Sequence, residues 1–430
     1  MVPHLVTALN GPINELEARI LESMPAIERW FRLEWMEHTP PLHTSVDLRN
    51  AGFKLAPVDT DLFPAGFNHL SPDVRPLAVQ AAMAAIEKIC PEARNLLIIP
   101  RPGVTDPFYL SNLEWLMQVF AMAGLNVRLG NLDKTAAPQT LVLPERGDTV
   151  VEPTQRQRGR LGLKDFDPCT ILLNTDVPPA QLSALQSLPT QFLLPPLHAG
   201  SASRRKTTHF HNYEEVAKKF AKLLGMDPWL INPMYGRCGE VNLADPTGLD
   251  CVQATADALL TKVRRKYKEY GINEKPFVVV KSDIGDGSGA GFMTVRDARD
   301  VPELARRHRR ASDRAEMEGV TEAIVQEGVP TCERVNQLVA EPVVYMIDRY
   351  VVGGFYRVHA ERGIDESLSA PGSMFVPLAF AESGALPKPG AKPGASAPNR
   401  FYMYGVIGRL AMLAAAYELE ATDPDADSDE

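Results

Sequence analysis

A lysine at the end of an apolar strand, followed by a glycine-rich loop, is the feature of this sequence best suited to chemistry. Three valines lead into Lys281, and glycine then stands at every second position from Gly285 to Gly291. Glycine lets backbone N–H groups approach an anion closely, and the lysine adds a positive charge. The segment therefore predicts a binding site for the phosphates of ATP, formed by Lys281, Gly285, Gly287, Ser288 and Gly289.

The residues after this loop distinguish between classes of nucleotide-binding fold. Residues 285–290 match the dinucleotide pattern G-x-G-x-x-A, which must open a helix. Here residues 292–295 predict a second strand, so the loop is expected at the tip of a β-hairpin. The chain has no Gly-Lys pair, which excludes a P-loop. A glycine-rich hairpin without a ligand remains the alternative.

Downstream residues could complete a site for Mg-ATP. The apolar strand and acidic dipeptide at residues 325–329 suit a hinge that pairs with adenine, so Gln326, Glu327 and Val329 are predicted to contact the base. Magnesium needs hard oxygen ligands, and Glu341 and Asp348 are the candidates. Arg357, on a predicted strand, could offer its planar guanidinium to the transferred phosphoryl group. A structural ion pair among these last three residues is the alternative.

Residues 47–68 mix charges of both signs with proline and glycine, which suits a loop that binds an amino acid. Arg49 or Lys54 could hold a carboxylate, and Asp59, Asp61 or Asn68 an ammonium group. Turn formation would explain several of these residues without any ligand. Further substrate-binding candidates come from other polar segments: Arg101, Tyr235 and Arg237.

A basic run at residues 204–206 could add positive charge over the phosphates as a lid. Such a run is more often a solvated face, so both interpretations stay open. Cys238 is interpreted as a small buried residue, since no activating histidine is evident near it in the sequence.

Composition limits the classes of function. The chain has 430 residues, enough for two to three domains, and a net charge of −9, which argues against a nucleic-acid partner or an electrostatic membrane anchor. No signal peptide and no apolar run of about 18 residues is evident. The five cysteines lack C-x-x-C spacing, so neither a disulfide framework nor a zinc site is expected. A cytoplasmic protein fits best, and the sequence predicts no oligomeric state.

The order of predicted elements is that of an α/β protein. Apolar residues at helical spacing predict an amphipathic helical segment over residues 13–38. A strand at 96–99, a helix over 109–120 and a strand at 127–129 form a βαβ unit with a parallel sheet. We predict an N-terminal helical and substrate-loop region (residues 1–95), an α/β domain (96–247), a nucleotide-binding α+β domain (248–420) and a disordered acidic tail (421–430).

Several of these features together resemble the ATP-grasp ligases. The Lys281 hairpin, the hinge at residues 325–328 and the Arg357 strand occur in the order of that superfamily, and the match is closest to glutathione synthetase. Residues 367–372 are similar to an Asn-Leu-x-Ala-x-Gly loop of those enzymes, with Ser367 in place of the asparagine. The resemblance implies an ATP-grasp-like fold for the C-terminal part.

Longer segments resemble the proteobacterial ATP-grasp-type glutamate–cysteine ligases. These segments are residues 58–68, 232–240 and 281–291, and the resemblance extends from about residue 45 to residue 419. It implies that L-glutamate, L-cysteine and Mg-ATP give γ-glutamylcysteine, ADP and phosphate, through an acyl phosphate, in the first step of glutathione synthesis. Another ATP-grasp carboxylate–amine ligase, a small-molecule kinase and a nucleotide-binding regulator remain alternatives.

Overall fold

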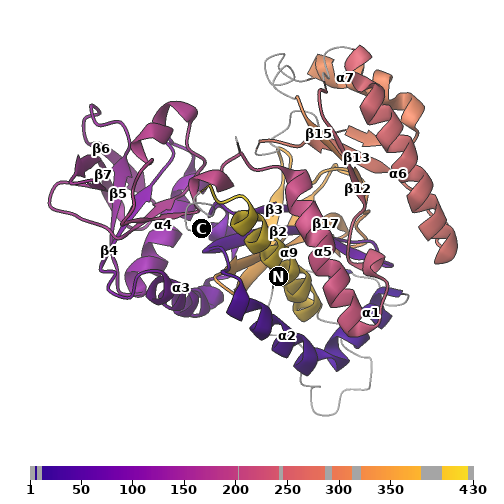
Figure 1. The fold of residues 1–430 in the computed structure, drawn as a ribbon, viewed down its shortest axis with the longest axis horizontal. Helices are drawn as coiled ribbons and strands as arrows, with labels where there is room; N and C mark the ends of the chain where they lie inside the picture. Colours follow the sequence, from indigo (N-terminus) through magenta and orange to yellow (C-terminus); the bar gives the residue numbers. More distant parts are fainter. Residues whose placement is uncertain are drawn as a thin grey trace.

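The computed structural model describes residues 5–6, 12–201, 203–241, 246–285, 293–311, 321–378 and 400–424. Three large sheets, one two-stranded ribbon and the helices that cover them make up this part of the chain (Figure 1). The predicted phosphate-loop residues Gly287, Ser288 and Gly289 lie outside it. Residues 383–398 and most of the predicted acidic tail also lie outside the described residues.

The central sheet has seven strands, all paired antiparallel. Its main path runs β1-β16-β17-β18-β19, and β2 pairs with both β17 and β3. The strands are β1 (Leu5–Val6), β2 (His43–Asn50), β3 (Leu55–Asp61), β16 (Arg334–Val335), β17 (Leu338–Ile347), β18 (Tyr350–His359) and β19 (Met374–Pro377). Strands from the N-terminal segment and from the C-terminal segment thus share one sheet, and the boundaries predicted at residues 95, 247 and 420 remain predictions.

The prediction that residues 47–68 form a loop is wrong for half of that segment, because β2 and β3 run through it. Val46 and Leu48 are fully buried, and they alternate with Asp47 and Arg49. This alternation has the period of a strand with one apolar face and one face toward the cavity described below. The charged residues made this strand hard to recognise in the sequence, because charged side chains are unusual on a strand face that does not line a functional site.

Helices cover the central sheet and bury its apolar face. Ile13, Phe31 and Phe220 contribute to the same core cluster as the strands. The predicted helical segment over residues 13–38 is confirmed and forms two helices, because Pro25 at the start of the second has no N–H to continue the first. The helices are α1 (Pro12–Glu22), α2 (Met24–Glu37), α5 (Lys206–Leu224) and α9 (Phe401–Ala421).

A six-stranded sheet with α3 and α4 lies at one side of the central sheet (Figure 1). Strands β4, β5, β7, β10 and β11 pair in parallel, and β6 pairs antiparallel at the edge. The predicted βαβ unit is confirmed as β4, α4 and β5. The elements are α3 (Arg75–Ile89), α4 (Pro107–Met122), β4 (Asn95–Ile99), β5 (Asn126–Asn131), β6 (Gln139–Leu143), β7 (Gly147–Pro153), β10 (Thr170–Leu173), β11 (Phe192–Leu194) and the separate ribbon of β8 (Gln155–Gln157) and β9 (Arg160–Gly162).

A four-stranded sheet, order β12-β15-β13-β14, lies with α6 and α7 on the other side (Figure 1). Strands β13 and β14 pair antiparallel, which confirms the predicted hairpin around the glycine-rich loop. Val278, Val280 and Val325 pack against α6 in a separate core. The elements are α6 (Asp250–Glu269), α7 (Val301–Ala311), β12 (Tyr235–Cys238), β13 (Val278–Ser282), β14 (Met293–Val295) and β15 (Ala323–Glu327).

Short 3₁₀ turns connect these elements, and two further sequence expectations can be compared with the structure. Cys90 and Cys169 form a disulfide, so the expectation of none is wrong. They lie 79 residues apart, at the end of α3 and just before β10, so their meeting depends on the fold. Among the described residues no helix has the length and apolarity needed to cross a bilayer. The turns are η1 (Phe67–His69), η2 (Pro72–Val74), η3 (Pro179–Ala184), η4 (Leu197–Ala199), η5 (Pro228–Leu230), η6 (Pro246–Leu249) and η7 (Ala298–Asp300).

Candidate active site

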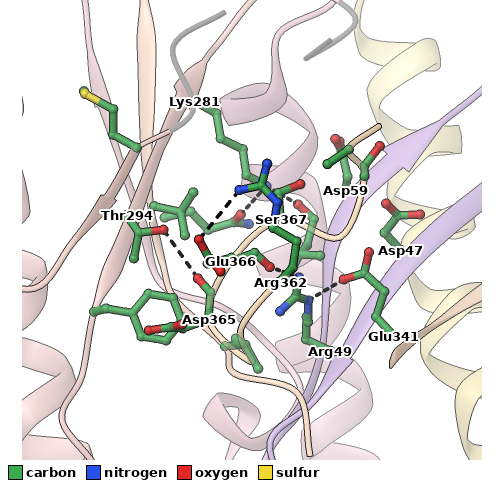
Figure 2. A pocket seen from close by; sticks show the side chains of 18 of the residues that line it. Asp47, Arg49, Asp59, Lys281, Thr294, Glu341, Arg362, Asp365, Glu366 and Ser367 are labelled. Atoms are coloured by element: carbon green, nitrogen blue, oxygen red, sulfur yellow. Dashed lines mark hydrogen bonds and ion pairs between the residues drawn. The ribbon is translucent and has the colours of Figure 1, made fainter. Parts of the chain in front are cut away.

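A cavity of about 980 Å³ lies between the four-stranded sheet and the central sheet (Figure 2). Strands β13, β14 and β15 line one side, β2, β3, β17 and β18 line the other, and the loop after β18 closes the space between them. We call this space the large cavity. Its lining brings together these predicted site residues: Arg49, Asp59, Lys281, Gln326, Glu327, Val329, Glu341 and Arg357.

One part of the large cavity is apolar and lies beside the predicted hinge. The N–H of Gly328 donates to the carbonyl oxygen of Phe277 at 2.8 Å, and a Cβ on Gly328 would lie 2.1 Å from the Phe277 ring. Only glycine therefore allows this close approach of the two strands. The apolar lining suits a flat heteroaromatic ring such as adenine and consists of Phe277, Val279, Met293, Leu304 and Val329.

Lys281 extends from the end of β13 into the large cavity (Figure 2). Its Nζ donates to the carbonyl oxygen of Val58 at 2.7 Å and to Oε1 of Gln326 at 3.0 Å. Burial lowers the pKa of Lys281 to about 8, although the charge of Asp59 acts in the opposite direction. A bound polyphosphate would stabilise the protonated lysine. Lys281 is thus held in place and electrostatically suited to an anion.

Arg357 lies between two carboxylates on the central sheet. Its Nη1 lies 2.6 Å from Oδ2 of Asp47 and 2.7 Å from Oε1 of Glu341. Although burial acts in the opposite direction, these carboxylates raise the pKa of Arg357. Burial raises the pKa of Asp47 despite the nearby guanidinium. The arrangement fixes a planar cation at the cavity wall, where it can face an oxyanion.

Arg49 connects this charged network to the loop after β18. Its Nε lies 2.5 Å from Oε2 of Glu341, and its two terminal nitrogens donate to the carbonyl oxygens of Ile364 at 3.0 Å and Glu366 at 2.7 Å. The guanidinium donates to the protein on three sides, so the predicted role of binding a substrate carboxylate is corrected to one of holding this loop. The loop carries Arg362, Asp365, Glu366 and Ser367 to the cavity (Figure 2).

The basic run at residues 204–206 is neither a free lid nor a solvated face. Arg204 pairs with Glu418 at 2.9 Å, and Arg205 pairs with Glu322 at 3.0 Å. Lys206 lines the large cavity and lies 3.0 Å from Asp59. Although burial acts in the opposite direction, Lys206 and Lys281 hold the pKa of Asp59 below its usual range. Asp59 is therefore an ionised carboxylate between two lysines.

Lys54 does not line the cavity, contrary to its predicted role in substrate binding. It is fully buried, its Nζ lies 2.8 Å from Oε2 of Glu327, and it lies 4.4 Å from the centre of the Trp229 ring. Glu327 also accepts from the backbone N–H of Met234 at 2.9 Å and from Trp229 Nε1 at 3.0 Å. Lys54 therefore stabilises the hinge through Glu327 from outside the large cavity. The Glu327 side chain is already bound by Lys54, Trp229 and Met234.

Asp348 lies far from Glu341, so these two candidate ligands cannot hold the same magnesium ion. Asp348 follows the last residue of β17 at a φ of 48°, and its carboxylate lies 3.3 Å from Lys88. Asp348 comes seven positions after Glu341, which is roughly 23 Å along a strand. Asp348 is therefore a turn residue at the opposite end of the strand.

The remaining predicted residues lie outside the large cavity. Arg237 on β12 pairs with Glu322 at 2.6 Å, and Tyr235 on the same strand packs near Phe210. Asn68 belongs to the turn η1. Arg101 and Gly285 line a second, smaller cavity, considered below.

The large cavity fits ATP, and it fits magnesium bound together with ATP. An apolar slot, Lys281 and Arg357 line one continuous space. Within the described ranges, no group of three or more His, Cys, Asp or Glu residues is placed to hold a metal ion alone. Magnesium on a nucleotide needs only one or two carboxylates, because phosphates and water supply its other ligands. Glu341 is the predicted metal ligand that lines the cavity.

Several residues of the large cavity were missed by sequence reasoning. Asp47 lies in the mixed-charge segment, and strand alternation could have identified it as a partner on the same face as other cavity residues. The residues of the loop after β18 follow no periodic pattern, and only the resemblance at residues 367–372 drew attention to part of this loop. The loop residues at the cavity are Arg362, Asp365, Glu366 and Ser367.

Comparison with known proteins gave a family match and a structural match that each cover nearly the whole chain. The family described as GshA, glutamate-cysteine ligase, matches residues 17–419. A crystal structure from Methylobacillus flagellatus KT, named as a candidate gamma-glutamylcysteine synthetase, is 49% identical with a TM-score of 0.85, and the match covers 98% of this chain and 100% of that chain. The search of curated proteins found no match.

Two further solved structures are only weakly similar and carry no argument. One is a glutathione synthetase-like effector (GSS30) from Globodera pallida, 10% identical with a TM-score of 0.37, covering 74% of this chain and 69% of that chain. The other is D-alanyl-alanine synthetase A from Vibrio cholerae O1, 13% identical with a TM-score of 0.32, covering 66% of this chain and 73% of that chain.

Proposed function

The chain belongs to the glutamate–cysteine ligase family, and we propose that its large cavity is where ATP is bound and where the γ-carboxyl group of L-glutamate is joined to the amine of L-cysteine. As a member of this family it is a ligase of glutathione biosynthesis, and its products are γ-glutamylcysteine, ADP and phosphate. The observation that carries the location is that Lys281, Glu341, Arg357 and an apolar slot line one cavity.

The nucleotide would lie across the four-stranded sheet. The base would occupy the apolar slot beside Gly328, and Lys281 would neutralise phosphate oxygens at the end of β13. Lys206, which lines the same cavity and pairs with Asp59, adds a second positive charge beside the phosphates. Because the lysines are already positioned by protein contacts, little reorganisation is needed when ATP binds.

The reaction would proceed in two displacements. An oxygen of the glutamate γ-carboxylate attacks the γ-phosphorus, the bond to the bridging oxygen breaks, and ADP leaves. The cysteine nitrogen then attacks the carbonyl carbon of the acyl phosphate, phosphate leaves, and the nitrogen loses a proton to solvent. Arg357 would stabilise the negative charge that develops on the oxygens in both steps.

Magnesium bound with ATP would neutralise charge on the phosphates, and Glu341 is the residue that we propose to hold it. Glu341 also pairs with Arg357 and Arg49. One carboxylate would therefore contact the bound magnesium and both arginines, and Arg49 in turn holds the loop after β18. We propose a cytoplasmic location, with which the family is compatible.

Release of ADP tests this assignment, measured with glutamate alone, cysteine alone and both together. We expect rapid release only when ATP, Mg²⁺ and both amino acids are present, with one γ-glutamylcysteine formed per ADP by mass spectrometry. Steady turnover with one amino acid would indicate a kinase or hydrolase. Turnover with a different amine in preference to cysteine would indicate another carboxylate–amine ligase.

A further inference from the structure

A second cavity of about 260 Å³ adjoins the large cavity. It lies between β3, the loop after β4, the end of β10 and the start of α5. Asp59 and Lys206 line both cavities, so this ion pair forms the boundary between them. We call this space the small cavity. A ligand in the small cavity would therefore lie next to the ion pair of Asp59 and Lys206.

Three buried polar atoms of the small cavity's lining have no hydrogen-bond partner among the described residues. They are Oγ1 of Thr60, Oδ1 of Asn174 and Nε2 of His209, on side chains that are at most 5% exposed. Buried polar atoms in native proteins almost always have partners. Three orphaned atoms around one cavity therefore indicate a polar ligand.

The chemistry of these atoms specifies what such a ligand must donate. Asn174 donates its Nδ2 to the carbonyl oxygen of Pro64 at 2.7 Å, so the orphaned Oδ1 is an acceptor. Nδ1 of His209 lies 3.0 Å from Glu418, and burial lowers the pKa of His209, which favours a neutral ring with an acceptor at Nε2. The Thr60 hydroxyl can also accept. An ammonium group, with three N–H donors, matches three acceptors.

The charges around the small cavity also favour a cation. Lys206 is balanced by Asp59, and Arg204 is balanced by Glu418. Two further carboxylates, the exposed Asp61 and the partly buried Asp176, line the cavity, and neither has a counter-charge in an ion pair among the described residues. A bound cation would supply that counter-charge.

Arg101, which could bind the carboxylate of an amino acid, lies at the exposed side of the small cavity. The guanidinium of Arg101 lies 5.0 Å from the centre of the Tyr109 ring, and its backbone N–H is fixed by the Tyr109 hydroxyl at 2.7 Å. No ion pair of Arg101 is formed within the described part of the chain. A carboxylate could therefore pair with Arg101 without displacing another anion.

We propose that the small cavity binds the α-ammonium and α-carboxylate groups of L-glutamate, while its γ-carboxylate passes Asp59 and Lys206 into the large cavity. Thr60, Asn174 and His209 accept from the ammonium group, and Arg101 binds the carboxylate. This inference rests on the proposed function and adds to it the location and recognition of one amino-acid substrate.

The role of the amine distinguishes glutamate from cysteine as the occupant. The cysteine amine must lose its proton to attack the acyl phosphate, whereas the glutamate amine takes no part in the reaction. Neighbouring carboxylates and acceptors stabilise the charged ammonium and raise its pKa. Such surroundings would make a nucleophilic amine unreactive, and they suit an amine that stays protonated.

Substitution of Thr60 by valine tests the assignment, because valine keeps the shape of the side chain and removes only the orphaned oxygen. We expect Thr60→Val to raise the KM for glutamate about tenfold, as for the loss of a hydrogen bond to a charged group, with the KM values for cysteine and ATP changed less than twofold. Thr44→Val is the matched control, since Thr44 is also buried with an orphaned Oγ1 but lines neither cavity.

Glutarate, which is glutamate without the amine, provides a second measurement on the unmodified enzyme. We expect its KM to exceed that of glutamate at least tenfold in the wild type, and the ratio to shrink about tenfold in Thr60→Val. Equal KM values for the two acids in the wild type, or a Thr60→Val effect on cysteine alone, would overturn the assignment. If the proposed function is wrong, the wild type makes no γ-glutamylcysteine. This outcome distinguishes failure of the proposed function from failure of the glutamate assignment.

Discussion

Asp283 accepts two hydrogen bonds from Thr207, one from the backbone N–H and one from the hydroxyl, each 2.7 Å long. Asp283 follows Lys281 by two residues, and Thr207 directly follows Lys206. The Asp283 carboxylate is fully buried. This contact caps the first turn of α5 and joins it to the end of β13, so both cavity lysines are positioned by one carboxylate.

Asp283→Ala should therefore impair both stability and nucleotide binding. Loss of a buried helix cap leaves two donors of Thr207 unpaired, and we expect the free energy of unfolding to fall by about 2 kcal/mol. The KM for ATP should rise about fivefold or more, because Lys281 and Lys206 lose their common support. Urea unfolding and steady-state kinetics measure the two effects.

Asp297→Ala is the control for this substitution. Asp297 caps the short turn η7 by accepting from the N–H of Arg299 at 3.0 Å, and it is partly exposed. We expect it to leave the KM for ATP unchanged. Equal KM values in Asp283→Ala and Asp297→Ala would show that the contact with Thr207 supports the fold alone.

Binding of ATP should depend on pH through Lys281. Burial lowers the pKa of Lys281 to about 8 in the free protein, and bound phosphates would raise it again. The charged form that ATP prefers is thus nearly complete one pH unit below this pKa and is lost as the pH rises through it, so affinity should decrease by up to tenfold per pH unit above that value. Calorimetry with a nonhydrolysable analogue avoids titration of the cysteine substrate.

The same measurement on Lys281→Arg provides the comparison. An arginine stays charged between pH 7 and 9.5. The affinity of the Lys281→Arg protein for the analogue should therefore not change with pH in this range, whatever the absolute affinity. A wild-type affinity that is equally flat would contradict the assignment of Lys281 to the phosphates.

Local patterns identified the elements that line one side of the large cavity. The hairpin that carries Lys281 combines an apolar run with glycines, and the hinge around Gly328 follows a second apolar run. Both are properties of contiguous residues, and the sequence displays them directly. The resemblance to glutamate–cysteine ligases, carried by longer segments, is confirmed by the family match.

The opposite side of the site depends on pairing between distant segments, which local patterns do not reveal. Asp47 meets Arg357 only because β2 joins β17 in the central sheet. The positive charge of Lys54 suggested that this residue binds a substrate carboxylate, but Lys54 is buried and pairs with Glu327. Asp348 is close to Glu341 in sequence but lies at the other end of the strand. Cys90 and Cys169 likewise meet only through the fold.

Arg357→Lys should slow turnover without unfolding the protein. A lysine keeps the charge but loses the planar fork that reaches both Asp47 and Glu341. We expect kcat to fall about a hundredfold, as for loss of a positioned electrostatic stabiliser, with a small change in melting temperature. Rapid-quench measurement of ADP formation reports the chemical step.

Arg334→Lys is the control for the arginine prediction. Arg334 lies on β16 of the same sheet, where its side chain donates to the carbonyl oxygen of Gln337 at 3.1 Å. It lines neither cavity. Its substitution should leave kcat within twofold of wild type, and a similar result for Arg357→Lys would remove Arg357 from the mechanism.

The buried pair of Lys54 and Glu327 should stabilise the hinge. Lys54→Met leaves the carboxylate of Glu327 without its cation, and we expect the free energy of unfolding to fall by about 3–5 kcal/mol. Adding Glu327→Gln should recover part of the loss, because an amide oxygen still accepts from Trp229 or Met234 and carries no charge. Lys88→Met, which breaks the half-exposed pair with Asp348, should cost about 1 kcal/mol or less.

The pH dependence of this stability has a definite sign. Burial lowers the pKa of Lys54 to about 8 from an ordinary value of 10.5, so between these values the unfolded chain binds more protons than the folded one. Stability from this group therefore rises with pH across that window. Urea unfolding at pH 7.5 and 9.5 should show the advantage of wild type over Lys54→Met growing with pH. A constant or shrinking difference would mean that Lys54 stays charged in the fold and that its pairing with Glu327 outweighs the cost of burial.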